Sequence, residues 1–157
     1  MPTHRQSAPD CRWERSFSAS LSEVPAAASW FESIAAELHL PESQTFAVQV
    51  CLEELMSNIA RHGNPAQHSS NPRSLDPANP FLISVAVNAF EDKITLTVED
   101  NGVPFNVAEA PTKGIDQPLH EVQPGGLGIH LIKSFADDLQ YRRTSKGNCV
   151  IAEFLAQ

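Results

Sequence analysis

The N-terminal part of the chain shows two hydrophobic periods in succession. Apolar and polar residues alternate over residues 11–20, which predicts an edge strand. Over residues 22–40 apolar residues recur at helical spacing, which predicts a helix, and Ser22 is placed to cap it. One side of the predicted strand carries Trp13, Arg15 and Phe17, and the helical stripe consists of Val24, Ala27, Ala28, Phe31, Ile34, Ala35 and Leu38.

A second helix is predicted directly after the first. Pro41 suits its first turn, and the apolar pattern continues to His62. Gly63 comes next, and glycine readily takes the left-handed conformation that is common after helix ends. We therefore expect the helix to stop at this glycine. Its apolar stripe consists of Val48, Cys51, Leu52, Leu55, Met56 and Ile59.

The second half of the chain predicts two hairpins and a third helix. Residues 64–80 are rich in Pro, Ser and Asn, which indicates either a mobile insertion or a long surface loop. Residues 81–100 alternate around a polar turn and predict a hairpin. A loop over residues 103–125 then leads to a helix that begins near Leu127, and the last two strands form a closing hairpin around Ser145–Gly147.

This order of elements predicts the fold class. Strands arrive mostly as antiparallel pairs with the helices grouped on one side, which is typical of an α/β (α+β) two-layer sandwich. We expect a mixed, mostly antiparallel sheet with helices on one face, and not a doubly wound parallel sheet. The length of 157 residues indicates a single domain over residues 11–157, after a disordered segment over residues 1–10.

The composition narrows the setting in which the chain works. No apolar run approaches the roughly 18 residues of a membrane span, and the polar N-terminus lacks the apolar region of a secretory signal, so we expect a cytoplasmic protein with no membrane contact. The formal net charge is −8, and no basic stripe with interleaved aromatic residues is present. Direct binding to nucleic acid is therefore not expected, whereas a positively charged protein surface is a suitable partner.

The cysteines and histidines point away from metal chemistry. Cys11, Cys51 and Cys149 lie far apart without C-x-x-C spacing, which argues against a disulfide framework and a thiolate metal site. We interpret all three as buried small hydrophobic residues. The six histidines are equally scattered and form no zinc-binding spacing.

The second predicted helix carries a carboxylate and an amide beside its apolar stripe. On a helical wheel Glu54 and Asn58 fall on the same flank of the stripe, whereas Glu53 falls roughly opposite. One explanation is an i, i+4 surface pair that contributes a few tenths of a kcal/mol. The other explanation is a site in which both side chains serve the same chemistry.

A carboxylate also ends the strand before the long loop. The inward row of residues 94, 96 and 98 continues by alternation to Asp100, so its side chain is expected on the core side. One interpretation is that Asp100 opens an Asx turn at "DNG". The other is that it accepts hydrogen bonds from the exocyclic amine of a ligand, while Gly102 lets a flat ring approach the backbone.

Three glycines lie at the start of the third predicted helix. Gly125, Gly126 and Gly128 allow successive N–H groups to point into one concavity at the positive end of the helix, which suits a phosphate chain. Glycine-rich loops are common, and this G-G-x-G spacing differs from the P-loop and dinucleotide-binding patterns. Taken alone, the glycines leave phosphate binding open.

Taken in order, the three segments resemble the boxes of the GHKL ATP-binding superfamily. The matching motifs are E-x-x-x-N on a helix ending in H-G, D-x-G-x-P-F after a strand, and G-G-L-G-I-x-L-I opening a helix. Within the superfamily, "EELMSNIARHG" and "EDNGVPFN" look most like the anti-sigma-factor serine kinases of bacterial partner-switching systems, the RsbW-like group. The resemblance covers residues 11–154 and implies a Bergerat-type ATP-binding fold with ATP and Mg²⁺ as cofactors.

The resemblance implies a role for each motif residue. Asn58 matches the asparagine that binds Mg²⁺, and Glu54 matches the acid that takes the proton from an attacking hydroxyl. Asp100 matches the aspartate that reads the adenine amine, and Gly102 matches the glycine beneath the ring. Asn148 occupies the place where many relatives have a threonine near the nucleotide. The phosphate-contacting glycines are Gly126 and Gly128, and the implied nucleotide site also includes Pro104, Phe105, Gly125, Leu127 and Ile129.

Two features lie outside this match. The first glycine box has Val103–Phe105 where many GHKL ATPases have a second glycine, a variant that resembles the kinase group. Lys113 in the long loop and the hairpin charges Arg142, Arg143 and Lys146 are interpreted as solvated, and we leave them out of the site.

The resemblance implies a serine/threonine protein kinase and anti-sigma factor. Such a protein phosphorylates an anti-anti-sigma protein of the STAS type and sequesters a sigma factor or a similar regulator. Two alternatives stay open, namely a non-catalytic, nucleotide-gated binding module and the detached catalytic domain of a histidine kinase. A homodimer is also expected, with helix 22–40 and the strand around Trp13 as the candidate interface.

Overall fold

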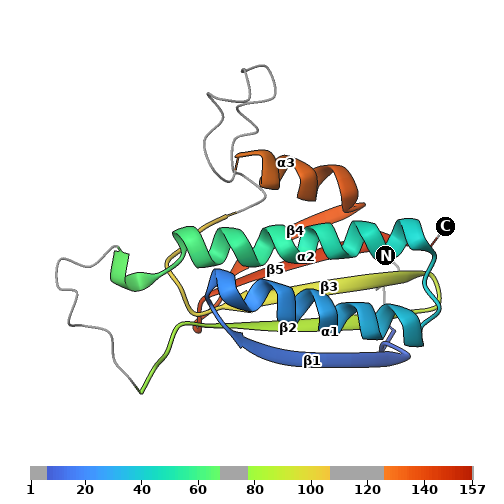
Figure 1. Ribbon diagram of the computed structural model, residues 1–157, viewed down its shortest axis with the longest axis horizontal. Coiled ribbons are helices and arrows are strands. Elements are labelled where there is room, and N and C mark those ends of the chain that lie inside the picture. The colour runs from blue at the N-terminus through green and yellow to red at the C-terminus, as the bar shows by residue number, and fades with distance from the viewer. Residues whose placement is uncertain (1–6, 68–77, 107–125, 157) are drawn as a thin grey trace, which may run out of the picture.

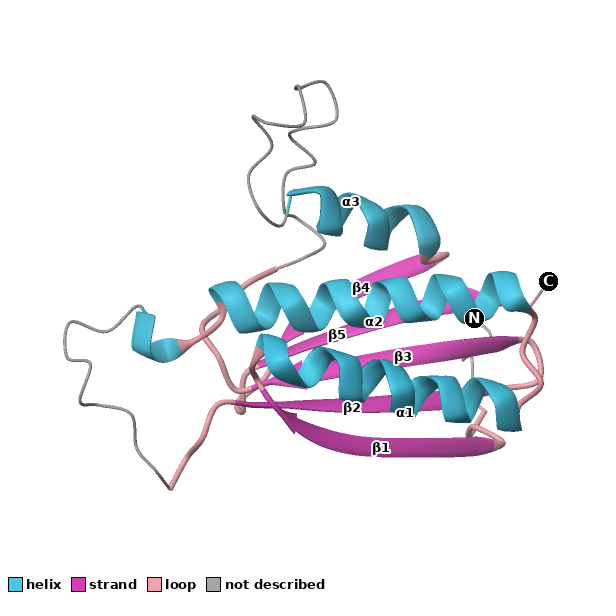
Figure 2. Cartoon of the chain, in the orientation of Figure 1, coloured by secondary structure: helices cyan, strands magenta, loops and turns pink. Residues whose placement is uncertain are grey.

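A computed structural model describes residues 7–67, 78–106 and 126–156 of the chain. The described residues form one five-stranded antiparallel sheet with its helices on one face (Figures 1 and 2). In chain order the elements are β1 (Cys11–Ser18), the 3-10 helix η1 (Leu21–Glu23), α1 (Val24–Glu37), α2 (Glu42–His62), the 3-10 helix η2 (Pro65–Gln67), β2 (Leu82–Ala89), β3 (Lys93–Asp100), α3 (Gly126–Phe135), β4 (Asp138–Arg143) and β5 (Asn148–Leu155).

The sheet confirms the predicted two-layer sandwich. Its strand order is β1-β2-β3-β5-β4, and every neighbouring pair is antiparallel. The strand over residues 11–18 is an edge strand, and both predicted hairpins form. Along β3 every second side chain is buried, because that row faces the helices.

The core lies between the sheet and its helices. α2 crosses the middle of the sheet and packs against α1 on one side and α3 on the other (Figure 1). The predicted stripe of α2 is buried throughout, which places the flank with Glu54 and Asn58 at the boundary with α3. The largest fully buried side chains are Phe31, Phe154, Leu52, Leu55, Met56, Ile83, Leu96 and Ile132.

The starts of the first two helices differ from the prediction. Ser22 does not cap α1; the Ser20 Oγ accepts a hydrogen bond from the Ser22 N–H, and a turn of 3-10 helix precedes α1. α1 begins after Glu23 without a side-chain cap, and its proline lies in the first turn, where a missing N–H costs nothing. Pro41 precedes α2 by one residue as its N-cap.

The helix α2 ends at His62 as predicted, but Gly63 is not left-handed. Its φ of −92° is helical, and its N–H donates to the Ile59 carbonyl at 2.8 Å. A Cβ at this position would lie 2.9 Å from the Ile59 oxygen and 3.2 Å from the Phe81 ring. A side chain here would therefore press against the last turn of α2 itself and against the Phe81 ring, and a left-handed backbone is not the reason for the glycine.

The cysteines only partly follow the prediction. Cys51 and Cys149 are buried, whereas Cys11, the first residue of the edge strand β1, is exposed. Burial, with a smaller contribution from the charge of Glu54, raises the pKa of the Cys51 thiol to about 12, so this thiol stays neutral. Among the described residues, no helix is long and apolar enough to cross a membrane.

Candidate functional site

The flank of α2 carries a buried amide with an unpartnered atom. Asn58 is 2% exposed, and its Nδ2 has no hydrogen-bond partner within the described parts of the chain. Burying an amide group without a partner costs about 1–3 kcal/mol, so packing alone does not account for it. Glu54 is half-buried one helical turn earlier. A ligand that contacts both side chains would supply the missing interaction.

The first turn of α3 lies against this flank. A Cβ added at Gly128 would collide with the Glu54 Oε2 and lie 3.7 Å from the Asn58 Nδ2. The glycine therefore leaves room for both side chains where α2 and α3 meet. The structure brings together the first and third of the predicted motifs, which are about seventy residues apart in the sequence.

The second motif converges on the same side of the molecule through Asp100. This residue ends β3, is 8% exposed and continues the buried row of Ile94, Leu96 and Val98. Its Oδ1 accepts hydrogen bonds from the Gly102 N–H at 2.8 Å and from the Asn148 Nδ2 at 3.0 Å. The Asx turn is therefore present, and the carboxylate is also buried. No group among the described residues bonds its Oδ2, which leaves that oxygen for a ligand.

Burial raises the pKa of the Asp100 carboxyl above its ordinary value. Hydrogen bonds from the Asn148 side chain and the Gly102 N–H oppose the increase, and so does the positive charge of Arg143. A carboxyl whose folded-state pKa is raised binds its proton more tightly in the folded state than in the unfolded state. Its contribution to stability is complete below the unfolded pKa and is lost as the pH rises through the folded pKa. The ionised Asp100 thus weakens the fold at neutral pH.

A small cavity connects Asp100 with α2. It has a volume of about 10 Å³, enough for one water molecule and far below the few hundred Å³ of a ligand pocket. The Phe105 ring lies on one side and stacks on His62 with centroids 6.5 Å apart. A flat base therefore enters only if a lining side chain moves, and Phe105 is half-buried on a loop. The lining residues are Leu55, Asn58, Ile59, Gly63, Asp100, Phe105, Asn148 and Val150.

Asn148 connects the elements around the cavity. It is 4% exposed, and its Nδ2 donates to the Asp100 Oδ1 and to the Val103 carbonyl at 2.8 Å. Its Oδ1 accepts from the Tyr141 hydroxyl at 2.6 Å and from the Phe105 N–H at 3.3 Å. The amide joins β3, β4, β5 and the loop after β3, so its bonds are all made within the protein.

Arg143 is exposed, as predicted for the hairpin charges, but its guanidinium also bonds two groups beside Asp100, which the prediction did not include. Its Nη1 donates to the Gly102 carbonyl at 2.8 Å and to the Asn148 Oδ1 at 3.2 Å. The signal for this placement was present, because Leu139 and Tyr141 alternate inward along β4 and the row continues to Arg143. Tyr141 was missed for the same reason. Arg142 and Lys146 are exposed like Arg143, as predicted.

Gly102 is held by the protein itself. A Cβ there would collide with the Gly63 carbonyl oxygen and lie 2.8 Å from the Phe81 ring and 2.9 Å from the Asp100 Oδ1. The Val103 N–H also donates to the Gly63 carbonyl at 3.0 Å. The close contact between this loop and the end of α2 explains the glycine, and the approach of a ligand ring stays a prediction.

The remaining predicted residues are placed less closely at the site. Pro104 is exposed. Ile129, on α3, is 7% exposed and belongs to the hydrophobic core. Gly126 and Leu127 form the first turn of α3. Gly125 and Lys113 lie outside the described residues, as do most of the predicted loops over residues 64–80 and 103–125.

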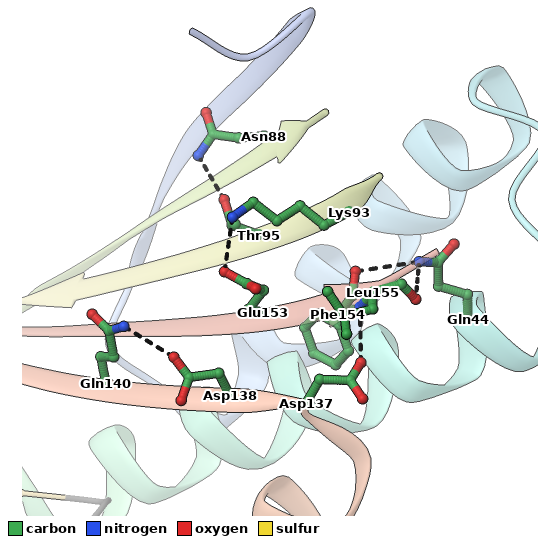
Figure 3. A network of polar contacts seen from close by, with 10 residues as sticks. All are labelled: Gln44, Asn88, Lys93, Thr95, Asp137, Asp138, Gln140, Glu153, Phe154 and Leu155. Carbon is green, nitrogen blue, oxygen red and sulfur yellow. Dashed lines mark hydrogen bonds and ion pairs between the residues drawn. The ribbon is translucent and has the colours of Figure 1, made fainter. Parts of the chain in front are cut away.

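A separate polar network lies at the opposite end of the sheet (Figure 3). Gln44 on α2 donates from its Nε2 to the Phe154 carbonyl at 3.5 Å and to the Leu155 carbonyl at 3.3 Å. Lys93 and Glu153 form an ion pair at 3.1 Å. Unlike Asn58, the buried amide of Gln44 has its partners within the protein.

Comparison with protein families agrees with this geometry. The profile of the histidine kinase-like ATPase domain matches residues 17–154. The crystal structure of the RsbU and RsbW domains of Rv1364c from Mycobacterium tuberculosis superposes with a TM-score of 0.59 at 10% identity. That alignment covers 96% of this chain and 34% of the other chain, and it bears on the fold alone.

Curated relatives are named as kinases and as an anti-sigma factor. The serine/threonine-protein kinase BtrW of Bordetella bronchiseptica is 25% identical over 119 residues, 76% of each chain. The serine-protein kinase RsbW of Bacillus mycoides is 34% identical over 97 residues, 59% of this chain and 53% of the relative. The anti-sigma F factor of Clostridium perfringens is 24% identical over 105 residues, 66% of this chain and 67% of the relative. The chain thus spans between about half and three quarters of these relatives.

Proposed function

Because this chain belongs to the histidine kinase-like ATPase domain family, we propose that it is an ATP-dependent serine/threonine protein kinase with an anti-sigma role. The observation that carries the proposal is the meeting of Glu54, Asn58 and Gly128 between α2 and α3, beside the buried carboxylate of Asp100. The names of the relatives support a protein acceptor with a serine or threonine hydroxyl.

Asp100 would recognise the base of the nucleotide. Its Oδ2 accepts a hydrogen bond from the exocyclic amine of adenine, while its Oδ1 stays bonded to Gly102 and Asn148. A carboxylate accepts but does not donate, so the ionised form prefers adenine to a base with a carbonyl oxygen at that position. The cavity must widen for the ring, and we assign that movement to Phe105.

Asn58 and Glu54 would act at the phosphate end. When bound, ATP supplies the γ-phosphoryl group and Mg²⁺ neutralises its charge. We assign the amide oxygen of Asn58 as a ligand for the metal, because the Nδ2 position has no partner among the described residues and the oxygen and nitrogen of a side-chain amide can be exchanged in assignment. Glu54 is one turn away and takes the proton from the acceptor hydroxyl. The glycine at 128 keeps the space between them open.

The proposed partners follow from the relatives. The acceptor is an anti-anti-sigma protein of the STAS type, and the sequestered regulator is a sigma factor, as the name of the anti-sigma F relative suggests. We propose a homodimer in the cytoplasm, with α1 and β1 at the interface. The net charge of −8 favours basic surfaces on these partners.

The direct test is transfer of label from γ-³²P-ATP in the presence of Mg²⁺ to an anti-anti-sigma protein of the STAS type from the same organism. Acid-stable, base-labile label on the acceptor supports a serine or threonine ester. Acid-labile, base-stable label would instead identify a histidine-phosphorylating domain. No label, together with equal partner binding in ATP, ADP and nucleotide-free buffer, would show a passive binding module and refute the kinase.

Replacing Asp100 with asparagine is expected to abolish nucleotide binding without weakening the free protein. The amide oxygen still accepts from Gly102 and Asn148, but the amide cannot place an acceptor at both carboxylate positions. The variant also lacks the buried charge that reduces stability at neutral pH, so its free energy of unfolding at pH 7 should equal or exceed that of the wild type. Calorimetry with ADP and urea denaturation measure the two effects; lower stability with unchanged ADP binding would contradict the assignment.

Replacing Asn58 with leucine is expected to stabilise the free protein by about 1 kcal/mol, because an unpartnered buried amide is removed. The same change should remove the Mg²⁺ dependence of ADP binding. Gln44→Leu is the matched control on the same helix: its amide is bonded to two carbonyls, so this variant should lose stability. If Asn58→Leu were as destabilising as Gln44→Leu, a retained functional amide would be the wrong explanation.

A further inference from the structure

The side-chain amide of Asn148 is held in one orientation by its neighbours. Its Oδ1 receives hydrogen bonds from the Tyr141 hydroxyl at 2.6 Å, the Arg143 Nη1 at 3.2 Å and the Phe105 N–H at 3.3 Å. A guanidinium and a backbone N–H only donate, so an amide nitrogen in this position would face two donors. The two donors therefore determine which atom of the Asn148 side-chain amide is the oxygen and which is the nitrogen.

This orientation turns the amide nitrogen toward Asp100. Nδ2 donates to the Asp100 Oδ1 at 3.0 Å and to the Val103 carbonyl at 2.8 Å. The three residues lie side by side across the end of the sheet, because Asp100 pairs with Asn148 and Asn148 pairs with Arg143 in the strand register. Arg143 also ties the Gly102 carbonyl at 2.8 Å, so one guanidinium contacts both the amide and the turn that Asp100 opens.

We propose that Tyr141 and Arg143 are positioning residues for nucleotide recognition, which hold the Asn148 amide so that it donates to Asp100 and keeps that carboxylate ionised. The identity of the ligand rests on the function proposed above, whereas the hydrogen-bonded arrangement is a property of the free protein. Both side chains lie on the edge strand β4, where Tyr141 is half-buried and Arg143 is exposed.

The alternative orientation shows what the arrangement prevents. With the amide inverted, the oxygen of Asn148 would face the Asp100 Oδ1 at hydrogen-bond distance, and two acceptors would repel each other unless the carboxyl took up a proton. A protonated carboxyl donates a hydrogen bond and would favour a carbonyl oxygen, such as the one on guanine. The pair of Tyr141 and Arg143 thereby sets the preference for an amine on the base.

Among the described residues, few titratable groups lie near Asp100. Arg143 and Tyr141 contribute from β4, and His62 contributes from the end of α2, where its ring stacks on Phe105. Of these groups, the charge of Arg143 acts on Asp100 and lowers its pKa, in the same direction as the hydrogen bond from Asn148. Burial raises the pKa of Asp100, and Arg143 opposes this increase both by its own charge and by orienting the Asn148 amide. Removing Arg143 therefore removes both effects.

The first test measures the Asp100 carboxyl in the full chain without nucleotide. We expect the pKa of Asp100, followed by the ¹³Cγ chemical shift, to rise in both Tyr141→Phe and Arg143→Met. Arg142→Met is the matched control, since it removes the same charge from the neighbouring residue, which pairs with Cys149 on the opposite face of β4. An unchanged pKa of Asp100 in Tyr141→Phe and Arg143→Met, or an equal rise in Arg142→Met, would overturn the proposal. Tyr141→Phe is conservative and serves if Arg143→Met fails to fold.

The second test measures binding of ADP and GDP with Mg²⁺ by calorimetry as a function of pH. Loss of a charge-assisted hydrogen bond is expected to weaken ADP binding by Arg143→Met about 10- to 100-fold at pH 7. GDP binding should be affected less. The pH below which ADP binding is lost should be higher in the variant than in the wild type. An equal loss for both nucleotides at every pH would indicate a merely structural role and reject the proposal. If wild type bound no ADP while the carbon titration showed the expected rise, the proposed function would fail and the positioning role would stand.

Discussion

Replacing Glu54 with glutamine is expected to reduce the rate of phosphoryl transfer by about 10²–10⁴-fold, the usual contribution of a general base. Glutamine has nearly the same size, so it should fit beside Gly128 without disturbing the meeting of α2 and α3. It cannot take up the proton of an attacking hydroxyl. ADP binding should remain within about twofold of the wild type, because the base acts on the acceptor and not on the nucleotide. Single-turnover transfer from γ-³²P-ATP measures the rate, and calorimetry measures binding.

Glu53→Gln is the matched control for this experiment. It removes the same charge from the adjacent residue on α2, which lies off the flank shared by Glu54 and Asn58. Its transfer rate should equal that of the wild type. Transfer by Glu54→Gln at the wild-type rate, or an equal loss in both variants, would remove Glu54 from the proposed mechanism without affecting the proposal that Asp100 binds the nucleotide.

Replacing Gly147 with alanine is expected to destabilise the protein by at least about 4 kcal/mol, a large fraction of the 5–15 kcal/mol of a typical domain. Gly147 has a φ of +154°, which residues other than glycine rarely adopt. An added Cβ would collide with the Asp100 carbonyl oxygen and lie 2.8 Å from the Asn101 Cα. Both obstacles are backbone atoms, so no side chain can move to relieve them.

Denaturation in urea, followed by circular dichroism, measures the effect of this substitution. Lys146→Ala is the control, since Lys146 is exposed in the same turn and its replacement should change the free energy of unfolding by no more than about 0.5 kcal/mol. Any folded Gly147→Ala protein should also bind ADP weakly, because the collision displaces the end of β3 that carries Asp100. A decrease of less than about 1 kcal/mol in the free energy of unfolding would contradict the prediction that a Cβ cannot be accommodated in this turn.

The convergence at the end of β3 shows how far sequence periodicity reaches. Alternation along residues 94–98 correctly placed Asp100 on the buried face, because a strand in an antiparallel sheet presents every second side chain to the same layer. The same rule applied to β4 would have placed Arg143 beside it. The position of Arg143 in a hairpin predicts a solvated side chain, and it contains no information on the two acceptors that the fold brings to the guanidinium.

The glycines illustrate a second limit. Sequence reasoning identified Gly63 as the end of a helix, which the structure confirms. It identified Gly102 as the place where a ligand ring approaches the backbone, which stays a prediction. The structure adds a contact between these two glycines that the sequence did not indicate. Gly63 and Gly102 face each other, with the Gly63 carbonyl in the space that a Cβ at 102 would occupy. Contacts between segments some forty residues apart depend on packing, which no local pattern encodes.

The strands and helices, the two-layer architecture and the three nucleotide motifs were readable from the chain, because each depends on periods or spacings within a few tens of residues. The contact of Gly128 with Glu54, the amide of Asn148 between Asp100 and Arg143, and the turn at Gly147 were settled only when the elements packed. Hydrogen bonds and steric exclusion act over a few Å of space, and the distance between two residues along the chain does not determine whether they come that close.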